Sequence, residues 1–184
     1  MIPALQFFKI VSGLLKLTDK VPKGVIEKSL TYPGLEEGNV PVKVIEPKSG
    51  CEKIFIIFPG ASPFAEEHPE TTKMAYLIAG MKIRVYLPRI PLLKDLIIST
   101  DNAEWMVHFY QWVINKEKTL KENIYIIGMS FGGALLLKAT LKMGLFTTPP
   151  VAIMTYGTFY NFDTTFNFLT TGVYHLEETK MYIQ

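Results

Sequence analysis

The sequence has a single cysteine, Cys51, among its 184 residues. One cysteine excludes a disulfide framework within the chain and a zinc site built from several thiolates, and we expect a cytoplasmic protein. The three histidines include no pair with metal-ligand spacing on a helix, and no glycine-rich stretch matches a phosphate or dinucleotide fingerprint. We therefore expect no metal and no cofactor.

Neither a long apolar run nor an excess of one charge is present. Lys9 and Lys16 interrupt the apolar N-terminus, so no run reaches the roughly 18 to 20 residues that span a bilayer. The net charge is only +2, which gives no reason to expect a nucleic-acid partner. Among the basic residues, we interpret Lys82, Arg84 and Arg89 as solvated surface charges. With 48% hydrophobic residues, the chain has enough buriable surface for one globular domain.

Residues 1–17 have the pattern of an amphipathic helix, and we assign residues 1–24 to an N-terminal helical segment. No small-x-small cleavage site follows, which argues against a signal peptide. The helix could pack on the body of the domain or on a second subunit of a homodimer, or it could contact a membrane surface weakly and so associate the protein with a membrane. Its apolar positions at helical spacing are Leu5, Phe8, Val11, Leu14 and Leu15.

Residues 25–157 alternate short β-branched runs with longer helical patterns, which predicts an α/β fold with a mostly parallel central sheet and helices on both faces. The continuous apolar run at residues 53–58 is typical of a central strand buried on both faces. We also expect residues 151–156 to form a buried strand. The other predicted strands are residues 25–31, 40–46, 83–87 and 123–127, and the predicted helices are residues 71–81, 103–116 and 134–143.

One short motif carries the chemistry. Residues 128–132 read Gly-Met-Ser-Phe-Gly, a match to G-x-S-x-G, the turn that raises a serine hydroxyl above the carboxyl edge of a parallel sheet. A shuffled chain of this composition would contain about 0.03 such matches. The motif also lies between a predicted strand and a predicted helix, which is the context it requires. Ser130 is therefore the candidate nucleophile.

The order of elements and this motif resemble the α/β-hydrolase family over roughly residues 25–156. In that family the loop after an early strand supplies a backbone N–H that stabilises the oxyanion, together with the N–H of the residue after the nucleophile. The resemblance implies that the N–H groups of Ala61 and Phe131 form this oxyanion hole. Pro59 stands where the family often has histidine, which is tolerable because the donors are backbone groups.

The family carries its acid and its histidine after the serine, in that order. The residues that follow Ser130 include one aspartate, Asp163, and one histidine, His175, so the resemblance names these two as the triad acid and base. No further strand is recognisable in the sequence between Asp163 and His175 that could bring the imidazole back over Ser130. We therefore expect a C-terminally incomplete α/β-hydrolase in which residues 158–184 form a lid-like or irregular segment, nearly inactive unless His175 folds back to Ser130.

Two hypotheses follow from these residues. The first is a serine hydrolase of the esterase or lipase type, which transfers an acyl group through Ser130 from a small-molecule ester with an apolar acyl or aryl group. Apolar neighbours of the motif, including Met129, Phe131, Phe64 and Phe159, favour such a substrate. The alternative is a truncated, non-catalytic fragment or a binding module on the same fold.

Overall fold

The computed structural model describes residues 20–97, 99–118, 121–142 and 148–159, and residues 161, 165, 167, 170 and 171. Within them a six-stranded sheet has the order β1-β2-β4-β3-β5-β6. Strands β4, β3, β5 and β6 are parallel, whereas β1 and β2 join them as antiparallel strands. The strands are β1 (Val25–Pro33), β2 (Asn39–Pro47), β3 (Lys53–Phe58), β4 (Ile83–Pro88), β5 (Ile124–Met129) and β6 (Ala152–Tyr156). The predicted fold class is confirmed.

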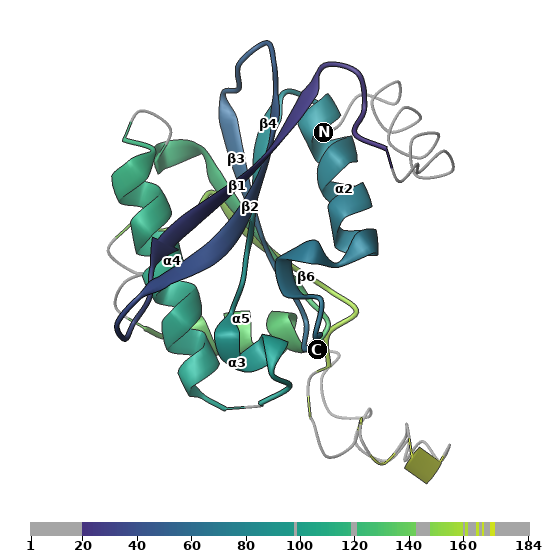
Figure 1. Ribbon diagram of the computed structural model, residues 1–184. Helices are drawn as coiled ribbons and strands as arrows, with labels where there is room; N and C mark the ends of the chain where they lie inside the picture. The colour runs from purple at the N-terminus through teal and green to yellow at the C-terminus, as the bar shows by residue number, and fades with distance from the viewer. Residues whose placement is uncertain are drawn as a thin grey trace, which may run out of the picture.

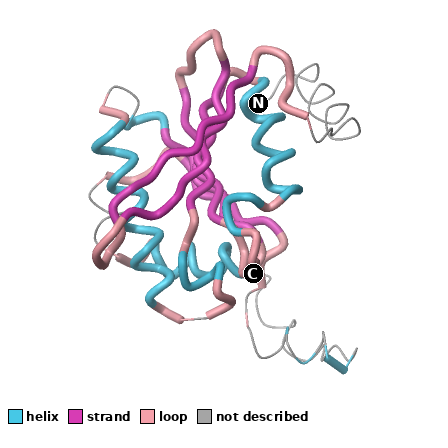
Figure 2. The backbone as a smooth tube through the Cα atoms, viewed as in Figure 1, coloured by secondary structure: helices cyan, strands magenta, loops and turns pink. Residues whose placement is uncertain are grey.

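Helices cover both faces of this sheet, as Figures 1 and 2 show. Helix α2 (Pro69–Gly80) lies on one face, and α4 (Asp101–Lys116) lies on the other together with α5 (Phe131–Ala139). The short α3 (Pro91–Lys94) follows β4. Two 3-10 turns, η1 (Ala65–Glu67) and η2 (Lys121–Asn123), precede α2 and β5.

Strand β3 shows why the sequence produces two cores. Alternate side chains of a strand point to opposite faces, so an uninterrupted apolar run supplies both faces at once. Ile54, Ile56 and Phe58 pack in the core beneath α4 and α5, and Ile57 packs in the core beneath α2. Residues 53–58 were predicted as a central strand, and β3 has these bounds and lies between β4 and β5.

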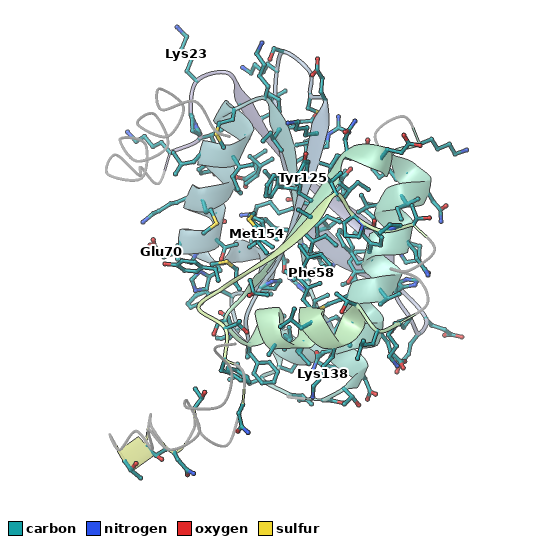
Figure 3. All side chains as sticks on the ribbon, turned by 180° about the vertical axis from the view of Figure 1, so that it is seen from behind. Lys23, Phe58, Glu70, Tyr125, Lys138 and Met154 are labelled. Carbon is teal, nitrogen blue, oxygen red and sulfur yellow. The ribbon has the colours of Figure 1, made fainter. Side chains whose placement is uncertain are left out.

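Strand β6 corrects one prediction. Residues 151–156 were expected to be a buried strand, but β6 is an outer strand of the sheet with Met154 46% exposed and Tyr156 68% exposed. Figure 3 labels Met154 on this strand, which lies in front of the other strands in that view. Among the described residues, β6 pairs only with β5. The exposure of β6 reflects its position at the end of the strand order, with one neighbouring strand in the part of the chain that the structure describes.

The arginines of β4 and its following loop correct another prediction, because both form ion pairs with half-buried or buried carboxylates. Arg84 donates to Glu46 and to both oxygens of Glu117 at 2.7 Å. Arg89 donates to Glu66, which is only 4% exposed. Neither arginine is a merely solvated charge. Lys82, the third basic residue in that interpretation, is exposed, as expected.

Several predictions fall on residues outside this description. The N-terminal helix at residues 1–17, and most of the assigned segment 1–24, lie outside the described residues, as do Asp163, His175 and most of residues 158–184. None of the helices in the described ranges is both long enough and apolar enough to cross a membrane.

Candidate active site

Ser130 occupies the turn between β5 and α5. Its backbone has φ 49° and ψ −124°, a conformation that residues other than glycine rarely adopt and that costs about 1–3 kcal/mol. The N–H of Ser130 donates to the Tyr156 carbonyl at 2.8 Å, and the Ser130 carbonyl accepts the N–H of Gly133 at 3.0 Å. The side chain is exposed at the carboxyl edge of the parallel strands.

The glycines around Ser130 are required by close backbone approaches. A Cβ atom on Gly128 would lie 2.6 Å from the Cα of Gly133, and one on Gly132 would overlap the Pro59 carbonyl oxygen. Real Cβ atoms do not approach other atoms this closely, so larger residues would displace the backbone. Gly132 therefore sets how near the loop after β3 can come to the start of α5.

That loop, residues 59–61, lies directly against Ser130. A Cβ on Gly60 would be 3.1 Å from the Ser130 Cβ and 3.6 Å from its Oγ. Ala61 and Phe131 both pack on the core cluster beneath α4 and α5. The structure thus brings together the loop and the serine that the sequence placed 70 residues apart. Convergence of the Ala61 and Phe131 N–H groups on one point stays a prediction.

The described histidines occupy two different environments. His108 on α4 lies with its Nε2 2.8 Å from the Pro33 carbonyl oxygen and its ring beside Trp105, so it packs between the helix and the end of β1. His68 precedes α2, and its buried Nδ1 has no hydrogen-bond partner within the described part of the chain. His175, the predicted base, lies outside that part, and so does Asp163.

Aromatic side chains flank the serine. The rings of Phe131 and Phe159 lie 5.4 Å apart, centroid to centroid, so the start of α5 contacts the segment that follows β6. Phe64, just beyond the 59–61 loop, is largely exposed. The Phe131–Phe159 pair therefore supplies apolar surface next to Ser130, and Phe64 supplies exposed apolar surface after the 59–61 loop.

Sequence reasoning missed the charged residues that follow the 59–61 loop. Glu66 and Glu67 lie in η1, and their partners are Arg89 after β4 and Lys43 in β2. Because its N–H groups donate to Glu66, the pKa of the Arg89 guanidinium is raised above its ordinary value. The available signal was two consecutive glutamates, Glu66 and Glu67, and such a pair does not identify distant partners.

No protein-family model matches this chain, and no curated protein sequence matches it either. Solved structures do match. The match to esterase Est22 has a TM-score of 0.64 and 14% identity. It covers 85% of this chain and 52% of the Est22 chain. The match to a dienelactone hydrolase from Anabaena variabilis has a TM-score of 0.59 and 17% identity. It covers 73% of this chain and 64% of the hydrolase chain.

A third structure, carboxyl esterase 2 from the fungus Tuber melanosporum, has a TM-score of 0.57 at 20% identity and covers 72% of this chain and 45% of its own. The chain thus spans between 45% and 64% of the length of these three proteins. At such identities the likeness shows the fold, and the described chain has the α/β-hydrolase fold.

Proposed function

We propose that the chain is a serine hydrolase that cleaves carboxylic esters by acyl transfer through Ser130. The observation that supports this most is the strained backbone of Ser130 at the end of β5, with the 59–61 loop packed against it. A serine that only connects a strand to a helix needs no such conformation. Backbone strain of this kind clusters at active sites, where the surrounding structure maintains it.

The proposed chemistry is acyl transfer by a serine, a histidine and an aspartate. Ser130 Oγ attacks the ester carbonyl carbon, and its proton passes to His175, which Asp163 orients. The N–H groups of Ala61 and Phe131 donate to the oxyanion that forms. The alkoxide or phenolate leaves with the proton from His175. A water molecule then gives a proton to His175 and attacks the acyl carbon, and Ser130 Oγ leaves with that proton as the acid is released. His175 and Asp163 enter this scheme by their order in the sequence alone.

The proposed substrate is a small ester with an apolar acyl or aryl group. Phe131 and Phe159 present a pair of rings beside Ser130, and the exposed Phe64 follows the 59–61 loop. Burying an acyl chain against such surface contributes about 0.8 kcal/mol per CH₂ group. A sugar or a peptide would offer less apolar surface to these side chains. Esterases among the matched structures support the choice of an ester as the substrate, without regard to its acyl group.

The test is hydrolysis of a series of p-nitrophenyl esters by the purified chain, with Ser130→Ala as the background. We expect kcat/KM to rise about three- to fourfold for each added CH₂ from acetate to butyrate, because each group adds about 0.8 kcal/mol of burial. A rate equal to that of Ser130→Ala for every ester would contradict the proposal and favour a non-catalytic fragment or binding module.

A further inference from the structure

The 59–61 loop has no polar side chain that could fix its position by hydrogen bonding. Pro59 is buried and the Ala61 methyl packs on the core, but Gly60 has no side chain, so the direction of the Ala61 N–H depends on what holds the ends of the loop. One end continues from β3. The other end leads through residues 62–64 into η1 (Ala65–Glu67).

Backbone hydrogen bonds connect the segment after the loop to α3 and stabilise its own turn. The N–H of Ser62 donates to the Leu93 carbonyl at 3.2 Å, and the N–H of Ala65 donates to the Ser62 carbonyl at 3.1 Å. Ala65 has a positive φ of 46°, so the turn is strained where η1 begins. A strained turn persists only when its surroundings determine it, which requires a stronger contact nearby.

Glu66 supplies that contact. Its carboxylate accepts hydrogen bonds from Arg89 Nε at 2.9 Å and from Arg89 Nη2 at 2.5 Å. Two parallel bonds from a guanidinium fix both the distance and the orientation of a carboxylate. Glu66 is 4% exposed, and a carboxylate this well buried is stable only while it remains paired.

Arg89 is itself held by the sheet. Its backbone N–H donates to the Pro41 carbonyl at 3.0 Å, and its carbonyl accepts the Tyr32 hydroxyl at 2.6 Å. These two bonds connect Arg89 to the antiparallel strands β1 and β2. A second ion pair, from Lys43 in β2 to Glu67, attaches the same turn to the sheet.

We propose that the Glu66–Arg89 ion pair is the positioning element that holds the 59–61 loop against Ser130. The sheet holds Arg89, and Arg89 holds Glu66. Glu66 in turn fixes η1, the turn into which the 59–61 loop leads. This inference rests on the proposed function insofar as Ala61 donates to an oxyanion. The position of the 59–61 loop itself does not depend on whether the chain is catalytic.

The experiment compares Glu66→Gln with Glu117→Gln. Glu117 is also a nearly buried carboxylate that accepts two bonds from an arginine, Arg84. Arg84 lies level with the first residue of β5, because both pair with Ile54. Ser130 is six residues further along, which is about 20 Å. The control therefore removes a similar ion pair at the opposite edge of the sheet.

Hydrogen exchange provides the readout that is independent of activity. We expect the amides of residues 61–65 to exchange about 10-fold faster in Glu66→Gln, with no change there in Glu117→Gln. In the ester assay, Glu66→Gln should lower kcat by about 10- to 100-fold with KM changed less than about twofold, because a displaced donor affects the transition state. Glu117→Gln should leave kcat within about twofold of the unmodified chain.

Unchanged exchange at residues 61–65 in Glu66→Gln would overturn the proposal. If that variant does not fold, Arg89→Lys tests the same point, since it keeps the charge but loses the bidentate geometry. Arg89→Lys should then show the faster exchange, and normal exchange would again overturn the inference. A chain without Ser130-dependent turnover but with the expected exchange pattern would refute the proposed function and leave the positioning role standing.

Discussion

Replacing His175 by alanine is expected to lower kcat for p-nitrophenyl butyrate by about 1,000-fold or more, to the same residual rate as Ser130→Ala. Residues that act as one catalytic unit are not additive, so the double variant should be no slower than either single variant. Asp163→Asn should also lower kcat strongly, because it would leave the imidazole in the wrong tautomer. The measurement is kcat and KM for all four variants, with the fold checked by circular dichroism.

His108→Gln is the matched control for these variants. His108 lies on α4, where its Nε2–H donates to the Pro33 carbonyl oxygen at 2.8 Å, and glutamine can keep that contact as a donor. Its kcat should remain within about twofold of the unmodified chain. Ser130-dependent turnover that survives in His175→Ala would show that another group is the base, and His68 would be the next residue to replace.

Gly132→Ala is expected to lower kcat/KM by about 100-fold and the free energy of unfolding by about 1–3 kcal/mol. The added methyl would overlap the Pro59 carbonyl oxygen, which belongs to the backbone and cannot rotate away. Either the 59–61 loop or the start of α5 must move, and both carry proposed oxyanion donors. Urea unfolding and the ester assay measure the two effects separately.

Gly80→Ala provides the comparison. Gly80 is the last residue of α2, and a Cβ there would meet no atom within 4 Å. Alanine should therefore leave kcat/KM unchanged and stabilise the chain by up to about 1 kcal/mol, because it restricts the unfolded backbone. A Gly132→Ala variant as active as Gly80→Ala would mean that the contact between Gly132 and the 59–61 loop has no catalytic role.

The parts of the fold that could be predicted from sequence are those with strong local signals. Residues 53–58 form an apolar run that Pro59 and Gly60 end, and β3 has those bounds. The helix after the motif was expected from residue 134, but α5 begins at Phe131. Gly132 and Gly133 have low helix propensity, and close packing against the Pro59 backbone and Thr158 overrides that propensity.

Features that depend on distant neighbours could not be predicted. The apolar composition of residues 151–156 indicates a strand, but it does not reveal how many strands flank it, so the exposure of β6 was missed. The partners of Arg84 and Arg89 lie between 23 and 38 residues away in the sequence. Such ion pairs follow from strand order and register, which no local periodicity encodes. For the candidate site, the motif identified Ser130, but not what holds the 59–61 loop.

The central claim is that Ser130 is an activated nucleophile, and covalent labelling by a fluorophosphonate tests it most directly. The folded chain should be labelled at one residue, which peptide mapping by mass spectrometry should identify as Ser130, and heat-unfolded chain should not react. Activation depends on the folded surroundings of a serine, so both parts of the result are needed. No labelling of the folded chain above the level of Ser130→Ala, or labelling at another serine, would contradict the account.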